Sequence, residues 1–226
     1  MKRLYRPNAF ASVAELACAI RHQDRPVILV EGTRDLPEAD RPHVVALGQM
    51  LARDLPGAIF RTGNATGSDT AFAEGVAAVD ANRLQYVLPH AGMGRQRRRA
   101  ESLAVALDAV PPAAEQVLAN ATASASPRSQ RLVELYVREK GGSAPAAKGA
   151  YLMRDTLKVL GCAELHLAPA TVGIFYVNEA DPMAGGTRHT LRVCIEHGVP
   201  VVPQEIWRNW LTSSPADSPP PGCSHL

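Results

Sequence analysis

The sequence alternates between short uninterrupted apolar runs and longer segments that place apolar residues on one helical face. Apolar runs without polar alternation are typical of strands buried on both faces, as in a parallel sheet. The first of them, Val27–Val30, is preceded by Pro26 and followed closely by Gly32. Strands are expected at 26–31, 58–62, 84–88, 170–177 and 199–202.

The segments between these runs carry apolar residues three and four positions apart, which predicts amphipathic helices. Helices are expected at 4–22, 38–54, 70–80, 151–160, 185–197 and 204–211. Gly198 is suited to end the fifth of them. Strands and helices that alternate with short connections favour right-handed crossovers. The pattern therefore predicts an α/β fold with a Rossmann-like, mainly parallel sheet and helices on both faces.

The middle of the chain, at about 92–149, differs from the rest because it contains no convincing strand pattern. Helices are expected there at 95–110, 112–121 and 129–140, followed by a loop at 141–145. We interpret this stretch as a helical insert within a single Rossmann-like, nucleotide-binding domain at 1–211. Residues 212–226 are rich in Ser and Pro, which predicts a disordered tail.

The composition is that of an ordinary globular protein. The 226 residues are 46% hydrophobic and 20% charged, with a formal net charge of +2, which argues against a disordered chain and against a surface that coats nucleic acid or membrane. No apolar run is long enough to span a bilayer and no signal peptide is evident, so a cytoplasmic protein without a membrane partner is expected. The four cysteines show neither a CxxC pair nor zinc-ligand spacing, so no metal site is expected.

A glycine-rich turn at Thr62–Asp69 joins the second predicted strand to the following helix. Gly63 and Gly67 permit positive φ angles and a close approach of the backbone to a ligand. Ser68 or Asp69 is suited to cap the helix. The free N–H groups and the positive dipole end of a helix N-terminus favour a phosphate. The turn predicts a phosphate site, although turns of this kind also serve as plain connections.

A second glycine-rich turn, at Met183–Thr190, also follows a predicted strand and opens a helix. Gly185 and Gly186 free its backbone. Its polar side chains supply hydroxyls, a guanidinium and an imidazole, at Thr187, Arg188, His189 and Thr190. Two such turns can lie side by side at the carboxyl edge of one parallel sheet, which is where doubly wound folds bind ligands.

The segment Glu31–Asp35, at the end of the first predicted strand, is expected to lie at the same edge. Gly32 allows a sharp exit from the strand, and Thr33 and Arg34 follow it at that edge. A guanidinium in this position is suited to bidentate recognition of phosphate or carboxylate. The three segments together predict a nucleotide or a nucleotide-derived phosphate as the ligand, and no further cofactor is indicated.

These segments resemble, in order, the motifs of the superfamily that joins the DNA-processing protein A recombination mediators to the lonely guy phosphoribohydrolases. Gly32–Arg34 is similar to its GSR or GTR opening, Thr62–Gly75 to its SGGAxGxDxxA motif, and Gly185–Thr190 to its third motif. The matches span about residues 26–203, with the helical insert unmatched. The resemblance implies a nucleotide-like ligand at these motifs and, because relatives often dimerise, a homodimer.

The third motif separates the two branches of this superfamily. Phosphoribohydrolases carry PGGxGTxxE, whose glutamate helps to break an N-glycosidic bond. Met183–Arg192 has neither that proline nor that glutamate, whereas Gly186–Thr190 is similar to the Gly-Ser/Thr-x-x-Thr pattern of the recombination mediators. Asn64 replaces the usual second glycine of the preceding motif. Tyr151–Asp155 resembles a Tyr-x-x-Arg-Asp that relatives place near the ligand, but we interpret its tyrosine as a packing residue.

Two other functions remain open beside nucleotide binding. One is a phosphoribohydrolase activity on a nucleoside 5′-monophosphate, in which Glu74 or Asp69 would direct a water molecule as the catalytic residue. The other is binding of single-stranded DNA, expected to be weak, by the glycine turns and the basic run at Arg97, Arg98 and Arg99. No aromatic residues are interleaved with this run to stack bases.

Overall fold

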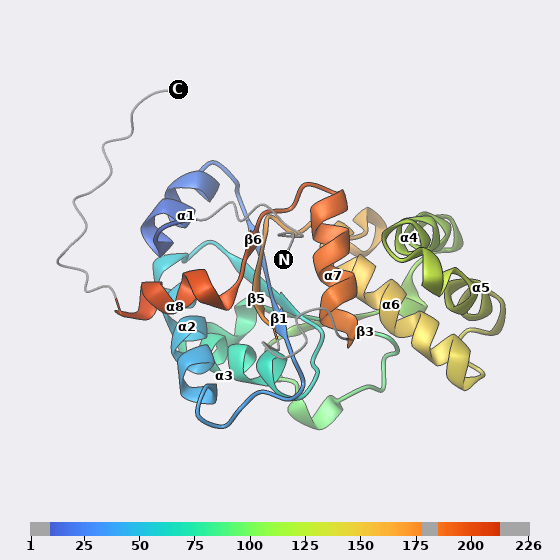
Figure 1. Ribbon diagram of the computed structural model, residues 1–226, viewed down its shortest axis with the longest axis horizontal. Coiled ribbons are helices and arrows are strands. Elements are labelled where there is room, and N and C mark those ends of the chain that lie inside the picture. Colours follow the sequence, from blue (N-terminus) through green and yellow to red (C-terminus); the bar gives the residue numbers. More distant parts are fainter. Residues whose placement is uncertain (1–9, 178–184, 213–226) are drawn as a thin grey trace.

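The computed structural model describes residues 10–177 and 185–212, and its centre is a six-stranded, all-parallel sheet (Figure 1). The strand order is β4-β3-β2-β1-β5-β6. The strands are β1 (Val27–Gly32), β2 (Ile59–Thr62), β3 (Leu84–Leu88), β4 (Leu103–Ala106), β5 (Val172–Tyr176) and β6 (Val201–Val202). This arrangement confirms the predicted α/β fold with a Rossmann-like parallel sheet.

The order of the strands reverses at β1. On one side β1 pairs with β2, with Leu29 opposite Arg61, and on the other side it pairs with β5, with Glu31 opposite Phe175. The chain moves outward from β1 to β4 and then returns to place β5 beside β1. The carboxyl ends of β1 and β5 therefore lie at the switch point of the strand order, which is where open α/β sheets bind ligands.

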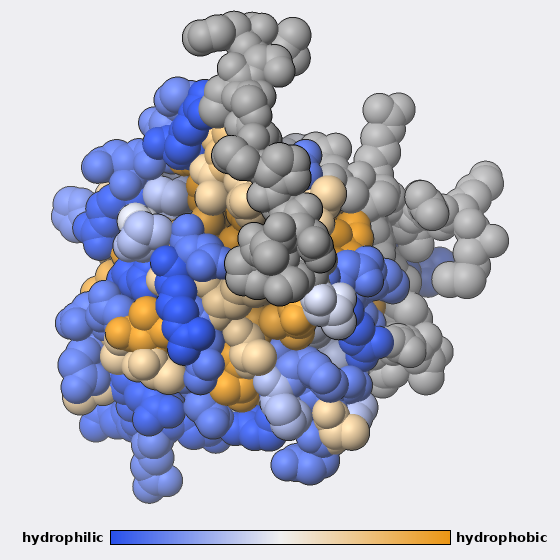
Figure 2. All heavy atoms as spheres, turned by 90° about the vertical axis from the view of Figure 1, so that its left-hand side faces the viewer, coloured by the Kyte–Doolittle hydropathy of each residue, from blue (hydrophilic) through white to orange (hydrophobic). Residues whose placement is uncertain are grey.

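Helices cover both faces of the sheet, as predicted (Figure 1). One face carries α1 (Val13–Ile20), α2 (Arg41–Asp54), α3 (Ser68–Asp80) and α8 (Gln204–Thr212). The other carries α4 (Pro112–Ala125), α5 (Gln130–Glu139), α6 (Ala144–Leu160) and α7 (Gly185–Glu196). The side of the molecule on which α1, α2 and α8 lie is largely hydrophilic, with scattered apolar patches (Figure 2).

The packing of β1 explains its uninterrupted apolar run. All six of its residues are buried. Ile28 and Val30 belong to the core shared with α2 and α3, whereas Leu29 belongs to the core on the side of α7. Because side chains alternate between the two faces of a strand and both faces are covered here, apolar residues are favoured on both, and Glu31 near the carboxyl end is the one charged residue of β1.

The expectation of a strand-free helical insert is wrong at one element. Leu103–Ala106, expected within a helix at 95–110, forms β4 and pairs in parallel with β3, with Ala104 opposite Tyr86. Leucine and alanine are strong helix formers, but pairing with β3 decides the conformation of this short segment. As an edge strand, β4 leaves Leu103 49% exposed, so no buried run marks it in the sequence.

Helix α6 begins at Ala144, seven residues earlier than predicted. The Ser143 hydroxyl accepts a hydrogen bond from the Ala146 N–H at 3.3 Å, and Pro145 lies in the first turn. Both features favour a helix start. The loop expected at 141–145 therefore shortens, and the extra turns bring Lys148 into the helix.

Three expectations concern the ends of the chain and the membrane. The predicted tail lies, from residue 213 onward, outside the described residues, as do residues 4–9 of the first predicted helix. Within the described ranges, no helix has both the length and the apolar character needed to cross a membrane.

Candidate functional site

A cavity of about 640 Å³ opens at the carboxyl ends of β1 and β5. The cavity is lined by the end of β1 with the loop that follows it (Gly32–Asp35), the turn before α3, one face of α6 and the first turn of α7. The structure thus brings together the three segments that the sequence places at this edge. The cavity lies at the switch point of the sheet, where a doubly wound fold leaves room for a ligand.

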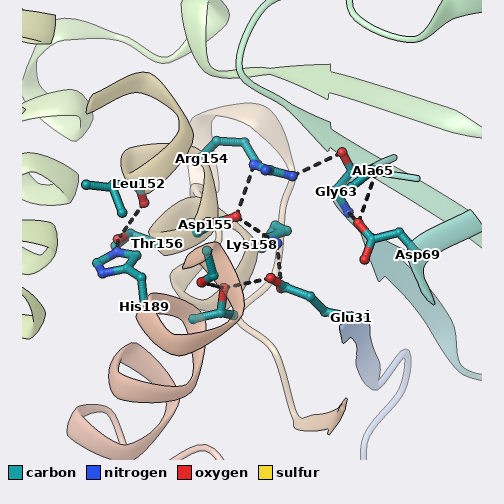
Figure 3. Close-up of polar contacts among 12 residues, drawn as sticks. Glu31, Gly63, Ala65, Asp69, Leu152, Arg154, Asp155, Thr156, Lys158 and His189 are labelled. Carbon is teal, nitrogen blue, oxygen red and sulfur yellow. Dashed lines mark hydrogen bonds and ion pairs between the residues drawn. The ribbon is translucent and has the colours of Figure 1, made fainter. Parts of the chain in front are cut away.

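The carboxylate of Asp69 fills the inside of the turn at 62–69. It accepts hydrogen bonds from the N–H groups of Gly63 at 3.1 Å and Ala65 at 3.2 Å (Figure 3). It also accepts one from the Gly32 N–H at 3.4 Å. The Asp69 carboxylate therefore occupies backbone N–H groups that the sequence analysis expected to bind a phosphate. Asp69 holds the turn against β1 and does not cap the helix through its side chain.

The glycines of this turn make room for other parts of the protein. Gly67 has a φ of 75°, and a Cβ there would overlap the carbonyl oxygen of Thr33. A Cβ on Gly63 would overlap the guanidinium of Arg154. The N–H and the hydroxyl of Ser68 both donate to the Thr33 carbonyl oxygen, at 3.0 and 2.9 Å. The glycines therefore allow the loop after β1, the turn and α6 to pack together.

Asn64, the residue that departs from the resembling motif, has a φ of 57°. Asparagine tolerates this left-handed conformation better than most residues other than glycine, which explains the replacement. Its Nδ2 donates to the Gly94 carbonyl oxygen at 3.1 Å, and Arg97 Nη2 donates to the Asn64 carbonyl oxygen at 3.3 Å. Asn64 therefore fastens the basic loop at 94–97 to the turn.

Four charged side chains are buried together at the floor of the cavity (Figure 3). Lys158 Nζ lies 2.5 Å from Glu31 Oε2 and 2.8 Å from Asp155 Oδ1. Arg154 Nε lies 3.1 Å from Asp155 Oδ1, and Arg154 Nη1 donates to the Gly63 carbonyl oxygen at 3.0 Å. Two cations and two anions compensate one another, so this cluster offers little net charge to a ligand.

The proton affinities within this cluster differ. Burial raises the pKa of Glu31 to about 7, and the charge of Lys158 opposes only part of that effect. Burial also acts to raise the pKa of Asp155, but Arg154 and Lys158 outweigh it and lower that pKa. Burial acts to lower the pKa of Lys158, but the two carboxylates outweigh it and raise that pKa. Glu31 is therefore the member of the cluster that exchanges a proton near neutral pH.

The first turn of α7 forms one wall of the cavity. The Thr187 hydroxyl donates to the Gly32 carbonyl oxygen at 3.1 Å, and the Thr190 hydroxyl donates to Glu31 Oε1 at 3.0 Å. Gly186 lies against α6, where an added Cβ would come within 2.8 Å of Asp155 Oδ2. These contacts place the positive end of the α7 dipole at the cavity.

His189 is not among the residues that line the cavity, but it positions this wall. Its Nδ1 lies 2.8 Å from Ser126 Oγ, and its Nε2 lies 2.9 Å from Thr156 Oγ1. Burial lowers the pKa of His189, which favours a neutral ring in the folded protein. The ring therefore ties α7 to α6 and to the end of α4.

Two exposed cations, Arg34 and Lys148, stand at the mouth of the cavity, and no acidic partner for them occurs among the described residues. The guanidinium carbon of Arg34 lies 5.7 Å from the centre of the Tyr151 ring, and that of Arg154 lies 5.6 Å from it. Tyr151 lines the cavity and is only partly buried. Its ring therefore presents an apolar surface to the cavity beside the positive charge of Arg34. Tyr151 is thus more than the packing residue that the sequence analysis expected.

Other residues singled out in the sequence lie away from the lining. Glu74 faces α2 and pairs with Arg41. In the basic run, Arg98 Nη2 donates to the Ala91 carbonyl oxygen at 3.4 Å, and Arg99 is exposed. Gly185 is the first residue of α7, and Met183 lies outside the described residues. In the described part of the chain, no group of three His, Cys, Asp or Glu residues could hold a metal ion.

Sequence reasoning missed the charged face of α6. It did not assign Lys158 to the site, and it connected Arg154 and Asp155 with a ligand only through a resemblance. A signal was present, because positions i, i+1 and i+4 of a helix that packs on the sheet carry charges. Charges on a buried helix face need partners, and Glu31 at the end of the first strand was available as one.

No protein-family model matches the sequence, and no curated protein matches it at a significant level. Among solved structures, the chain is similar to DNA processing protein A from Helicobacter pylori, which is described with a single-stranded DNA binding mode. The TM-score is 0.45 at 15% sequence identity, and the match covers 82% of this chain and 67% of that chain. At this level the similarity does not extend to a ligand or an activity.

Proposed function

We propose that the cavity at the switch point binds a nucleotide or a nucleotide-derived phosphate. The observation that carries this proposal is the joint presence, on one cavity, of the α7 N-terminus and of the unpaired cations Arg34 and Lys148. A helix N-terminus provides free N–H groups and a positive dipole end, and a nearby guanidinium adds bidentate donors for phosphate.

The distribution of charge favours the α7 side of the cavity for the proposed phosphate. Arg154 and Lys158 are neutralised by Asp155 and Glu31, and Asp69 already occupies the backbone N–H groups of the turn before α3. Among the described residues that line the cavity, the first turn of α7 and the two mouth cations remain available to an anion. Tyr151 offers its ring to the base or sugar, since aromatic surfaces stack well on nucleobases.

The geometry favours binding over hydrolysis. Of the two carboxylates that the sequence suggested for catalysis, Glu74 lies outside the lining, and Asp69 accepts three backbone hydrogen bonds. Neither is placed to direct a water molecule at a ligand on the α7 side of the cavity. We therefore expect little or no release of free base from nucleoside 5′-monophosphates.

Mass spectrometry of small molecules released from the denatured protein tests the proposal, followed by thermal unfolding with each nucleotide identified. A bound nucleotide raises Tm by mass action. Replacing both mouth cations, as Arg34→Ala with Lys148→Ala, should reduce that shift strongly. Arg53→Ala, an exposed change on α2 at the other face of the sheet, should leave it intact. A full shift in the double variant, or no response to any nucleotide, contradicts the proposal.

A further inference from the structure

Three arginines gather beside the first turns of α7. Arg188 and Arg192 are four residues apart on α7 and therefore share one face of the helix. Arg128 lies in the short helical turn at 127–129, two residues after Ser126, whose hydroxyl lies 2.8 Å from the His189 ring. Arg128, Arg188 and Arg192 are named here the arginine cluster.

The members of the arginine cluster are close enough to affect one another. The pKa of Arg192 is lowered, first by burial and then by the positive charges of Arg188 and Arg128. Among the described residues, none of the three forms an ion pair, and Arg188 Nε is buried without a hydrogen-bond acceptor. This contrasts with Arg154 and Lys158, whose charges are fully paired. Like charges held together without an acid destabilise the protein until an anion joins them.

The arginine cluster lies next to the cavity, although none of its three members lines it. Ser129 and Thr187 line the cavity, and they are the chain neighbours of Arg128 and Arg188. Arg192 lies six positions after Gly186, the proposed phosphate position, which corresponds to about 9 Å along a helix. Phosphate groups two or three units along a polyphosphate chain, or on the far side of a dinucleotide, lie within that reach.

We propose that the arginine cluster is a second phosphate subsite, so that the ligand is a nucleotide carrying phosphate groups beyond the first. This inference rests on the proposed function, because the first phosphate is the one at the α7 N-terminus. The ligand extends from the cavity along α7, and the arginine cluster binds its additional negative charge. Nucleoside polyphosphates and phosphate-bridged dinucleotides belong to this chemical class.

Calorimetry without divalent metal, using the four common ribonucleoside 5′-triphosphates and their 5′-monophosphates, tests the inference. Wild-type protein should bind at least one triphosphate about tenfold or more tightly than its monophosphate, as expected for added charge-assisted hydrogen bonds. Arg192→Ala, one turn further along α7, should reduce this preference by about tenfold while leaving monophosphate affinity unchanged. Arg192→Glu should abolish the preference, and Arg53→Ala should retain it.

A readout without ligand separates a binding role from a structural one. If like charges strain the arginine cluster, Arg192→Ala should have a higher Tm than the wild type when no ligand is bound. At saturating triphosphate the wild type should have the higher Tm. Equal affinities for mono- and triphosphates, or equal losses of both in the variants, overturn the second subsite and leave the proposed function standing. No binding of either class by the wild type overturns the proposed function itself.

Discussion

Glu31 Oε2 and Lys158 Nζ lie 2.5 Å apart at the floor of the cavity, and both side chains are almost completely buried. Lys158 also pairs with Asp155, so a single cation holds two carboxylates that come from β1 and α6. Removing one member of such a cluster leaves uncompensated charge in a poorly solvated place, which costs more than the net contribution of the pair itself.

Lys158→Met should therefore lower the free energy of unfolding by about 3–5 kcal/mol at pH 8, measured by urea denaturation. The loss should be smaller at pH 5, because Glu31 is then protonated and needs no cation. Arg138→Met breaks an exposed ion pair with Glu139 and should cost about 1 kcal/mol or less. Equal costs for the two substitutions at pH 8 would contradict the importance of the buried pair.

Glu31 should make stability fall as the pH rises toward 7. Its pKa is raised from 4.5 to about 7 in the folded protein, so its contribution is fully present below about pH 4.5 and is lost as the pH rises through about 7. The loss is on the order of 3 kcal/mol. The lowered pKa of His189 acts in the opposite direction below about 6.5.

The difference between wild type and Glu31→Gln isolates the Glu31 contribution. The free energy of unfolding of the wild type relative to Glu31→Gln should decline between about pH 4.5 and 7.5 and be level above that range. The lowered pKa of Asp155 acts only below its ordinary value of 3.8 and does not enter this range. A difference that stays level from pH 4.5 to 7.5 would show that Glu31 is charged throughout that range and that its pKa is not raised.

The fold could be predicted from the sequence wherever burial on both faces leaves an apolar run, as in β1 and β5. The edge strand β4 could not, because Leu103 and Ala104 face solvent and their type favours a helix. Its strand conformation comes from pairing with Tyr86 and its neighbours, a contact made by residues some twenty positions away. Local propensity therefore misses elements whose conformation depends on a partner strand.

The position of the site could be predicted from the sequence, but the contacts among its residues could not. The glycine turns indicated the right edge of the sheet, since turns after parallel strands meet there. The structural role of those glycines could not be predicted, because Gly63 makes room for the side chain of Arg154, some ninety residues later in the chain. Likewise, Glu31 becomes evident as the partner of Lys158 only when β1 and α6 are brought together.

Gly63→Ala should destabilise the protein by about 2–4 kcal/mol, because the new methyl group displaces Arg154 from its place beside Asp155. The matched control is Gly57→Ala, where an added Cβ meets only the Asp24 carbonyl oxygen at 3.8 Å and stability should change by about 0.5 kcal/mol or less. Urea denaturation measures both. Similar small costs would mean that Arg154 has another position of equal energy.

The basic run at 97–99 should contribute little to binding of single-stranded DNA. Arg97 and Arg98 donate to the carbonyl oxygens of Asn64 and Ala91, so part of their donor capacity fastens the loop after β3 to the protein. Replacing Arg97, Arg98 and Arg99 together by alanine should flatten the slope of log affinity against log salt by less than the roughly 0.7 expected for one phosphate contact to a single strand. Fluorescence anisotropy with a labelled oligothymidylate over a range of salt concentrations measures both slopes, and Arg53→Ala is the control.

Binding should be weak and lost below physiological salt, because the run has no aromatic side chains to stack bases. Sub-micromolar affinity at physiological salt that disappears in the triple variant would instead make single-stranded DNA the ligand of this protein.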